Sequence, residues 1–248
     1  MKITKSIFLF LPLLLASCTP VQHISKTQVG YVVPGKEESM AIDQDVVSMV
    51  APYKIQVDSQ MNKVIAVVKT ELVKKQPEST MGNWCTDAML WGIEKAGLHA
   101  DFALMNYGGM RIPVITPGPL TMGELFELSP FDNALMIVDV PGNFVDTMFQ
   151  HIASKDGWPV SDEVRMTISQ KKMIQCTING APIDPAKTYK VLMPDYVANG
   201  GDDARFLIPL ARYQTGLLQR DMLIEYAKEI SQSGRQIEAS VEGRIVKQ

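Results

Sequence analysis

The sequence predicts an α+β (mixed α/β) domain, in which a mixed sheet is packed by helices. Segments with helical spacing and segments with strand patterns alternate irregularly along the chain, which favours this class over a regular doubly wound sheet. Residues 164–169 and 173–178 alternate in polarity as paired strands do, and an Asn-Gly turn follows them. A hydrophobic content of 46% is enough to form a buried core.

The first 18 residues read as an export signal. Lys2 and Lys5 give a positive start, residues 7–15 are apolar apart from one proline, and Leu-Ala-Ser-Cys ends the stretch at Cys18. That ending resembles a bacterial lipobox, in which the cysteine becomes the lipidated first residue of the mature protein. We therefore expect Cys18 to carry a lipid anchor. The alternative is an ordinary cleaved signal with an incidental cysteine.

Three regions follow from this interpretation: a signal peptide at 1–18, a polar tether at 19–39 and a folded domain at 40–248. No later segment is apolar over a length that would span a bilayer. The expected location is outside the cytoplasm, lipid-anchored to the bacterial cell envelope on its periplasmic or surface face.

The first half of the domain contains two helical patterns and one strand pattern. Apolar residues recur with helical spacing over 42–53, with Pro52 near one boundary, and residues 62–72 are rich in Val and Ile, as in a strand. After a polar loop at 74–80, helical spacing returns over 81–93, and Gly97 is a plausible stop.

The middle of the domain begins with a short strand at 101–105 that runs into the Gly108-Gly109 turn. A Thr-Pro-Gly-Pro turn is expected at 116–119. Thr121 and Glu124 have the spacing of a capping box, which indicates a short helix over 121–128. An apolar strand at 134–140 and an amphipathic helix at 142–153 follow.

The last third begins with the two paired strands and the hairpin-type turn at Asn179-Gly180. A strand at 189–193 then leads into an Asn-Gly-Gly-Asp loop. A helix at 222–230 and a closing strand at 240–246 complete the predicted elements.

Charge and metal-ligand content restrict the function. The formal charge is −3 and no basic stripe is visible, so polymeric nucleic acid is not an expected partner, whereas small anions remain open. The three histidines lie far apart and form no ligand motif, so we expect no metal site, no bound cofactor and no catalytic residue in this chain. Cys85 and Cys176 are interpreted as small buried residues rather than a disulfide.

Three segments combine an aromatic ring with a tight-turn residue and a polar group. They are Asn106-Tyr107-Gly108-Gly109-Met110-Arg111, Pro130-Phe131-Asp132-Asn133, and Asp195-Tyr196 leading to Asn199-Gly200-Gly201-Asp202. Paired glycines permit positive φ and close approach of a ligand, a guanidinium suits phosphate oxygens, and aromatic faces stack on bases. Taken singly, each segment is also compatible with a glycine or proline turn, a core phenylalanine or a capped amide.

Together the three segments resemble the C-terminal, substrate-binding domain of the 5'-nucleotidase and UDP-sugar hydrolase group. In that family a Gly-Gly-x-Arg turn, a Pro-Phe-x-Asn loop and an aromatic followed by Gly-Gly-Asp occur in the same order. Met81-Gly82-Asn83-Trp84 is also similar to a Leu-Gly-Asn helix start of the family, and Asp184-Pro185 to its strand lead-in. The resemblance covers roughly residue 40 to the C-terminus.

The resemblance implies a nucleotide or nucleoside site. Phe131 and Tyr196 would sandwich the base with Asn133 at its edge, and Arg111 and Asp202 would hold phosphate or sugar. The site would also include Asn106, the glycine pairs Gly108-Gly109 and Gly200-Gly201, and Lys75. Lys74 and Lys75 stand where the family often has arginines, and a lysine lacks the bidentate fork of a guanidinium.

The same resemblance implies that this sequence lacks one of the two domains of the family. Full-length relatives carry an N-terminal metallophosphatase domain with Asp-x-His, Asn-His-Glu and Gly-His segments, which this sequence lacks. We therefore expect the chain to be inactive or nearly so alone, with a divalent metal in a separate metallophosphatase chain. The alternative is a stand-alone nucleoside- or nucleotide-binding envelope lipoprotein. A structural envelope domain and a self-sufficient hydrolase that recruits a metal are the weaker alternatives.

Overall fold

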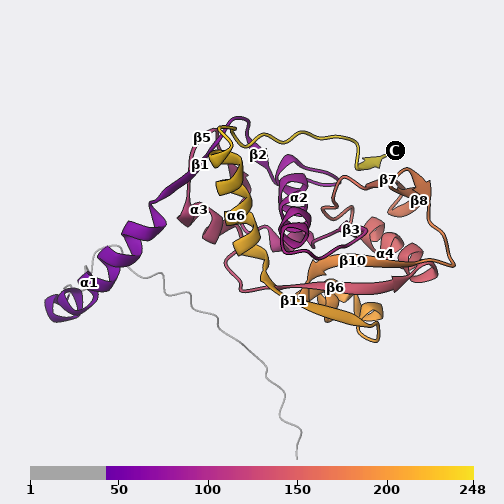
Figure 1. Cartoon of the computed structure of the whole chain (residues 1–248), viewed down its shortest axis with the longest axis horizontal. Helices are drawn as coiled ribbons and strands as arrows, with labels where there is room; N and C mark the ends of the chain where they lie inside the picture. Colours follow the sequence, from indigo (N-terminus) through magenta and orange to yellow (C-terminus); the bar gives the residue numbers. More distant parts are fainter. Residues whose placement is uncertain (1–42) are drawn as a thin grey trace, which may run out of the picture. The chain divides into compact units, whose positions relative to one another are not determined.

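A computed structural model describes residues 43–248 of the chain (Figure 1). The predicted signal peptide, tether and lipidated Cys18 lie outside the described residues. The described part contains no helix with the length and hydropathy needed to cross a membrane.

The main sheet has the strand order β11-β6-β10-β3. Its strands are β11 Arg212–Leu218, β6 Ala134–Pro141, β10 Thr188–Pro194 and β3 Phe102–Ala103. β6 pairs antiparallel with both of its neighbours, whereas β10 and β3 run parallel, with Val191 opposite Phe102. The sheet is therefore mixed, which confirms the predicted α+β class.

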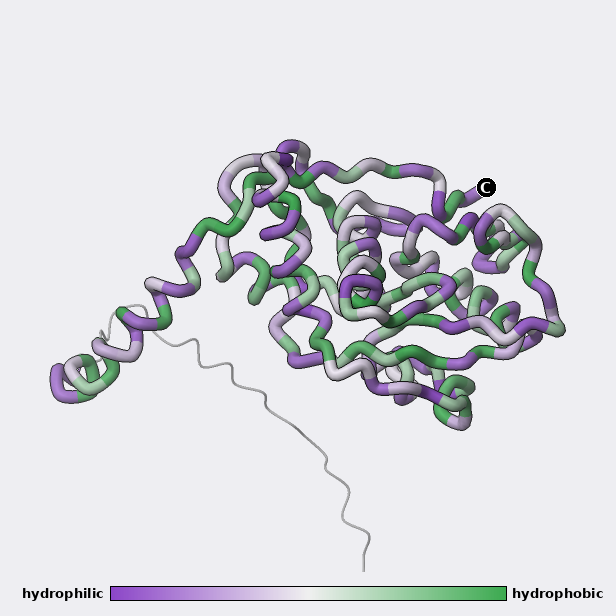
Figure 2. The backbone as a smooth tube through the Cα atoms, in the orientation of Figure 1, coloured by the Kyte–Doolittle hydropathy of each residue, from purple (hydrophilic) through white to green (hydrophobic). Residues whose placement is uncertain are grey.

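Alternation along the central strands divides the core between the two faces of this sheet. In β6, Leu135 and Ile137 belong to one buried cluster, and Val138 and Val140 belong to another. This is the period of two expected for a strand that is covered on both faces. Figure 2 shows hydrophobic stretches along the strands inside the domain and hydrophilic residues at the outer turns.

Helices cover both clusters. α2 Thr80–Lys95 and α6 Gln219–Gln232 supply buried residues to the first cluster, and α4 Gly142–Ser154 supplies Phe149 to the second. The Phe149 ring stacks on Phe102 of β3 with 5.6 Å between centroids. The Ser79 side chain caps α2 by accepting from the Gly82 amide, and Gly97 lies just beyond the end of this helix at φ 77°. The predicted start and stop of this helix are confirmed.

The remaining strands form one further four-stranded sheet and two small pairs. The larger sheet has the order β12-β7-β8-β9, and the pairs are β1-β5 and β2-β4. Their bounds are β1 Val64–Val68, β2 Leu72–Val73, β4 Val114–Ile115, β5 Gly118–Thr121, β7 Val164–Ser169, β8 Lys172–Ile178, β9 Ala181–Pro182 and β12 Ile245–Lys247. Asn179 and Gly180, both at positive φ, form the predicted hairpin turn between β8 and β9.

The first helix and the Pro-Gly-Pro turn differ from the predictions. Helix α1 spans Gln44–Met61, so Pro52 lies inside it rather than at a boundary, and none of its residues is buried. The predicted turn at 116–119 is shorter, because Gly118–Thr121 already pairs with β1. Pro119 is tolerated there since a two-stranded sheet leaves one edge of each strand without partners.

The capping-box helix is present as α3 Met122–Leu128, with both reciprocal hydrogen bonds of Thr121 and Glu124 formed. Strand β11 was not predicted. Its sequence, Arg-Tyr-Gln-Thr-Gly-Leu-Leu, has no clear apolar alternation, and its register on β6 shifts between Gln214 and Leu218. The closing strand is limited to β12, because the preceding residues are held by side chains instead of a ladder.

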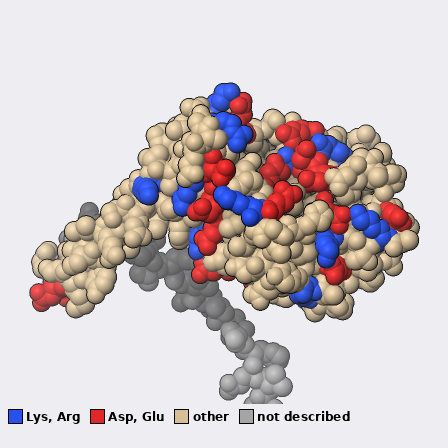
Figure 3. Space-filling model, viewed as in Figure 1, with Lys and Arg blue, Asp and Glu red and all other residues tan. Residues whose placement is uncertain are grey.

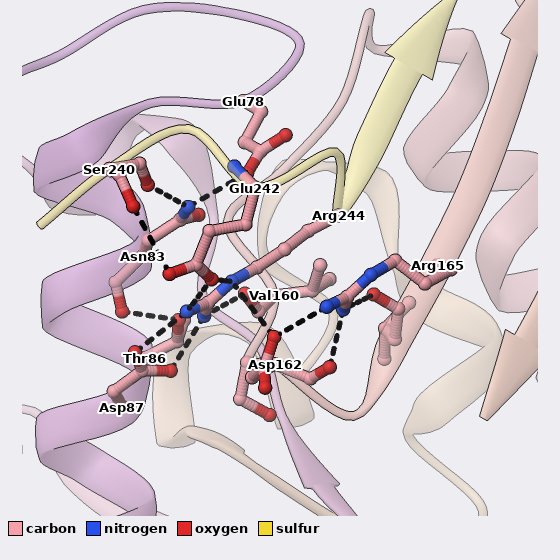
Figure 4. Close-up of polar contacts among 12 residues, drawn as sticks. Glu78, Asn83, Thr86, Asp87, Val160, Asp162, Arg165, Ser240, Glu242 and Arg244 are labelled. Carbon is pink, nitrogen blue, oxygen red and sulfur yellow. Dashed lines mark hydrogen bonds and ion pairs between the residues drawn. The ribbon is translucent and has the colours of Figure 1, made fainter. Parts of the chain in front are cut away.

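A buried polar network holds this C-terminal segment against the start of α2 (Figure 4). Arg244 forms two hydrogen bonds with the Asp87 carboxylate, of 2.6 and 2.8 Å, and also donates to Glu242. Glu78 accepts from the Asn83 side chain and from the Glu242 amide, both at 2.8 Å. Burial raises the pKa of Asp87, an effect that the adjacent Arg244 opposes. Buried charges of this kind are tolerated only when they are paired.

The two described cysteines are buried, and neither forms a disulfide. Cys85 lies in α2 and Cys176 in β8, as predicted. Burial raises the pKa of both thiols, that of Cys176 to about 12. Since the thiolate is the reactive form, both side chains are inert core residues in the folded protein.

Candidate ligand-binding site

One cavity of about 430 Å³ brings the three predicted segments together. Its lining consists of Asn106, Gly108, Gly109, Arg111, Phe131, Asn133, Tyr196 and Asp202. The segments are the loop after β3, the loop after α3 and the residues that follow β10, which lie far apart in the sequence. The main sheet and the helix preceding Phe131 thus position the pocket.

Three predicted residues lie outside this cavity. Gly200 and Gly201 line an adjoining, more open cavity of about 510 Å³ that shares Asn133 and Tyr196 with the first. Lys75 lines neither cavity.

The glycine pair after β3 forms a short 3-10 turn, η2 Tyr107–Gly109. Neither Gly108 nor Gly109 adopts positive φ, so the conformational freedom that a glycine pair permits is not used here. Gly109 is needed for space instead. A Cβ atom there would lie 2.9 Å from the Met105 methyl and 3.1 Å from the Asn106 side-chain oxygen. Gly109 therefore allows the turn to pack closely on Met105 and Asn106 while it lines the cavity.

Phe131 is half exposed, with 52% of its surface accessible, and its ring faces a cation. The Arg111 guanidinium carbon lies 5.5 Å from the ring centroid, and the same side chain donates to the Gly108 carbonyl at 3.4 Å. An exposed aromatic face beside a guanidinium can bind a flat heterocycle that carries an anionic group.

Arg220, which no sequence pattern indicated, anchors the loop that carries Phe131. Its buried guanidinium donates to the carbonyls of Ser129 and Phe131 at 3.3 and 3.5 Å, and it pairs with the Asp132 carboxylate. The group also lies over the Phe126 ring at 4.2 Å. Its only sequence signal is an arginine near the start of a helix, which does not distinguish it from a solvated residue.

Tyr196 and Asp202 form another part of the lining. Tyr196 lies in the short helix α5 Asp195–Ala198, and its hydroxyl donates to Asp202 Oδ1 at 2.9 Å. The hydrogen bond to Asp202 raises the pKa of Tyr196. Asn106 donates to the other oxygen, Oδ2, at 2.7 Å. One face of the ring is covered by Gly201, where a Cβ would approach the ring carbons to 2.4 Å. The glycine therefore allows the ring to pack on the backbone.

Arg212 of β11 is a second support that the sequence did not reveal. Its guanidinium donates to the Ala198 carbonyl and to the Asn199 side chain, both at 2.8 Å, and to the carbonyls of Leu207 and Ile208. These bonds connect the two ends of the loop that contains Gly200, Gly201 and Asp202.

Neither Lys74 nor Lys75 lines the cavity, but Lys74 contacts the turn that carries Gly108 and Gly109. Its ammonium donates to the Met110 carbonyl at 2.7 Å and lies over the Tyr107 ring at 4.3 Å. Partial burial, and secondly the positive charge of Arg111, lower the pKa of Lys74. Two cations that lie near each other attract an anion, so Lys74 and Arg111 are the candidate phosphate contacts.

On the face shown in Figure 3, basic and acidic side chains are interspersed.

Within residues 43–248 no group of three or more His, Cys, Asp or Glu side chains is placed to hold a metal ion. The one carboxylate that lines the pocket, Asp202, already accepts from Tyr196 and Asn106. The chemistry of the lining is that of binding: aromatic faces, amides, one guanidinium and one carboxylate.

The fold and pocket define an α+β domain with a concave site for a small, flat and polar ligand. Residues 63–208 match the family described as the 5'-nucleotidase C-terminal domain. The chain belongs to this family.

Curated relatives agree with this assignment. The chain is 27% identical over 203 residues to the protein UshA of Yersinia enterocolitica, with 78% of this chain and 36% of UshA covered. It is 24% identical over 256 residues to the cell wall protein Lmo0130 of Listeria monocytogenes, with 90% and 32% covered. The chain thus spans about a third of the length of these relatives.

Among solved structures, the 5'-nucleotidase precursor from Thermus thermophilus superposes with a TM-score of 0.72 at 29% sequence identity. The match covers 83% of this chain and 43% of the Thermus chain. The fold of the C-terminal domain is therefore shared.

Proposed function

We propose that this chain is the nucleotide-recognition module of a 5'-nucleotidase-type phosphohydrolase. The observation that carries the proposal is the cavity that Phe131, Tyr196, Arg111 and Asp202 line together. The two rings would hold the base, with Asn133 at its edge. Asp202 would accept from ribose hydroxyls, and Arg111 with Lys74 would contact the phosphate.

We assign the hydrolytic step to a metallophosphatase carried by a separate chain. The family matched is a C-terminal domain, and the relatives named above are about three times as long as the matched segment. A two-metal centre would supply the activated water and stabilise the leaving oxygen. In this chain the residues bind and orient the nucleotide so that its phosphate projects beyond Arg111.

Calorimetry on the purified chain tests the recognition half of the proposal. AMP and adenosine should bind, AMP more tightly, and UDP-glucose tests how much of the ligand beyond the first phosphate is accepted. The double variant F131A/Y196A should lose both ligands. Failure of the wild-type chain to bind any of the three would exclude a nucleotide site.

Reconstitution tests the catalytic half. The chain is mixed with AMP, Mn²⁺ or Mg²⁺ and a candidate metallophosphatase, and phosphate release is compared with that of each protein alone. A gain that F131A/Y196A abolishes supports the split enzyme. Tight binding without any gain would instead assign the chain as a stand-alone nucleoside- or nucleotide-binding lipoprotein.

We also propose export and lipid anchoring through Cys18. The Leu-Ala-Ser-Cys ending supports this, and one relative is named a cell wall protein. Labelling cells with a clickable palmitate analogue should mark the wild-type protein. Cys18→Ser should remove the label and release the protein from membranes; a label retained by this variant would contradict the anchor.

A further inference from the structure

Asp202 has an unusual backbone for the residue that would hold a ribose. Its φ is 49° and that of Asp203 is 69°, so two successive non-glycine residues lie in the left-handed region, directly after Gly200 and Gly201. Side chains with a Cβ atom rarely adopt this conformation, and it persists where the surrounding structure holds it. The contacts that hold this turn thus determine where the carboxylate points.

Every polar group of Asp202 has a partner. The carboxylate accepts from Tyr196 and Asn106, and the Asp202 amide donates to the Tyr196 hydroxyl at 3.3 Å. The remaining group, the backbone carbonyl, lies 3.0 Å from Nε2 of His151. Since a carbonyl can only accept, Nε2 carries the proton of this hydrogen bond. Tyr196 and Asn106 line the pocket, whereas His151 does not.

His151 is itself fixed by packing. It lies near the end of α4, and its ring makes edge contacts with Trp158 and Phe206 at centroid distances of 5.3 and 5.5 Å. Trp158 is buried, and Phe206 packs against the second hydrophobic cluster. The imidazole is therefore a rigid donor that projects from the helix to the turn.

Helix α4 makes a second contact with the same turn, and this contact stabilises the turn less. Lys155, at the end of the helix, pairs with the Asp203 carboxylate at 2.7 Å, but both side chains are exposed. Exposed pairs of this kind contribute little. His151 is thus the main connection between α4 and the left-handed turn.

We propose that His151 is a positioning residue for ribose recognition: it holds the Asp202 carbonyl, and thereby directs the Asp202 carboxylate toward the vicinal hydroxyls of a bound nucleoside. The proposal rests on the proposed function for its ligand, but not for the conformation of the turn. His151 acts through Asp202 without touching the nucleoside.

The test compares His151→Ala and His151→Gln with the wild type, and uses His99→Ala as a matched control because His99 is exposed. Glutamine can place its amide nitrogen near the position of Nε2 and can donate the same hydrogen bond. The thermal midpoint of each variant establishes that it is folded.

Hydrogen–deuterium exchange without ligand reports on the turn directly. In His151→Ala the amides of residues 199–205 should exchange faster, while His151→Gln and His99→Ala should resemble the wild type. Unchanged exchange in His151→Ala would overturn the proposal whether or not the protein binds nucleosides.

Calorimetry with adenosine and 2',3'-dideoxyadenosine then reports on recognition. Loss of one hydrogen-bonded contact predicts about threefold to tenfold weaker adenosine binding in His151→Ala, with dideoxyadenosine nearly unaffected. His151→Gln should recover most of the difference. Equal weakening of both ligands would overturn the positioning role, because it would indicate general damage to the pocket. If the wild type binds neither ligand, the proposed function and the ribose assignment fail together, and the exchange data alone decide whether His151 holds the turn.

Discussion

The Tyr196 hydroxyl donates to the Asp202 carboxylate at 2.9 Å, so an aromatic wall of the pocket and the carboxylate in the same lining are joined. A phenylalanine at this position would provide the ring without this connection. The ring is also packed on Gly201 and is 47% exposed, which leaves its other face accessible. The ring and the carboxylate are therefore fixed before a ligand arrives.

Replacing Tyr196 separates the contributions of the hydroxyl and the ring. Tyr196→Phe should weaken adenosine binding by about 0.5–1.5 kcal/mol, since Asp202 loses one donor. Tyr196→Ala should cost a further ~1–3 kcal/mol, because stacking on the base is also lost. Calorimetry measures both. Tyr213→Phe on β11 is the control, because Tyr213 is an exposed tyrosine outside the pocket; equal effects at both positions would contradict the assigned role.

Phe131→Ala should weaken binding of AMP and of adenosine alike, by about 1–3 kcal/mol, because the stacking surface serves the base. The thermal midpoint should change little, since the ring is half exposed. Ile174→Ala on β8 removes another exposed apolar side chain and should leave binding unaltered. Affinities unchanged in the Phe131 variant would show that this ring does not contact the base.

Lys74→Ala should weaken AMP binding by about tenfold and leave adenosine binding nearly unchanged, because a charge-assisted contact to phosphate is lost. Lys75→Ala is the matched control, because Lys75 is the next residue and is exposed, whereas Lys74 contacts Met110 and the Tyr107 ring. The measurement is the ratio of the AMP and adenosine dissociation constants in each variant. A larger change in that ratio for Lys75→Ala would reverse the assignment of the two lysines.

Arg244→Met should lower the free energy of unfolding by about 1–3 kcal/mol, since charge-assisted hydrogen bonds to Asp87 and Glu242 are lost, while these carboxylates, 34% and 39% exposed, keep access to water. Urea denaturation followed by circular dichroism measures the loss. Arg235→Met removes an exposed arginine and should change the stability by less than about 0.5 kcal/mol. A comparable loss in both variants would argue against the buried network as the cause.

Because the thiol of Cys176 is buried, we expect the folding stability of the protein to decrease in alkaline solution. Burial raises its pKa to about 12, whereas an unfolded cysteine titrates near ~8.5. The folded state keeps the proton longer, so this contribution is complete below about pH 8.5 and decreases as the pH rises toward 12. Denaturation midpoints between pH 7.5 and about 10 should decrease less in Cys176→Ala than in the wild type. Parallel pH profiles would exclude the thiol as a contributor.

Strong local patterns predicted the fold well. The capping box of Thr121 and Glu124, the hairpin turn at Asn179 and the apolar strand that became β6 each form where they were expected. Strand β11 was missed because its stability comes from pairing with β6 and not from its own alternation. The extent of α1 was missed because a proline is a weaker boundary than the pattern assumed.

The residues of the pocket were also predicted only in part. Turn residues and rings in three segments predicted the members of the lining, because each segment has a local signature. The supports were not predicted: Arg212, Arg220 and His151 act through the fold on residues distant in sequence. The choice between Lys74 and Lys75 also depends on which side of a loop faces the cavity, and no periodicity defines that.

The last forty residues restrict where this protein can be truncated. The family match ends at residue 208, yet β11 lies against β6, and Ile237 exchanges backbone hydrogen bonds with Val67 and Lys69 of the first strand region. A fragment that stops at the family boundary would expose the apolar strand β6 as a free edge, a template for intermolecular pairing. Insoluble aggregates, rather than a smaller working protein, are the expected product of such a truncation.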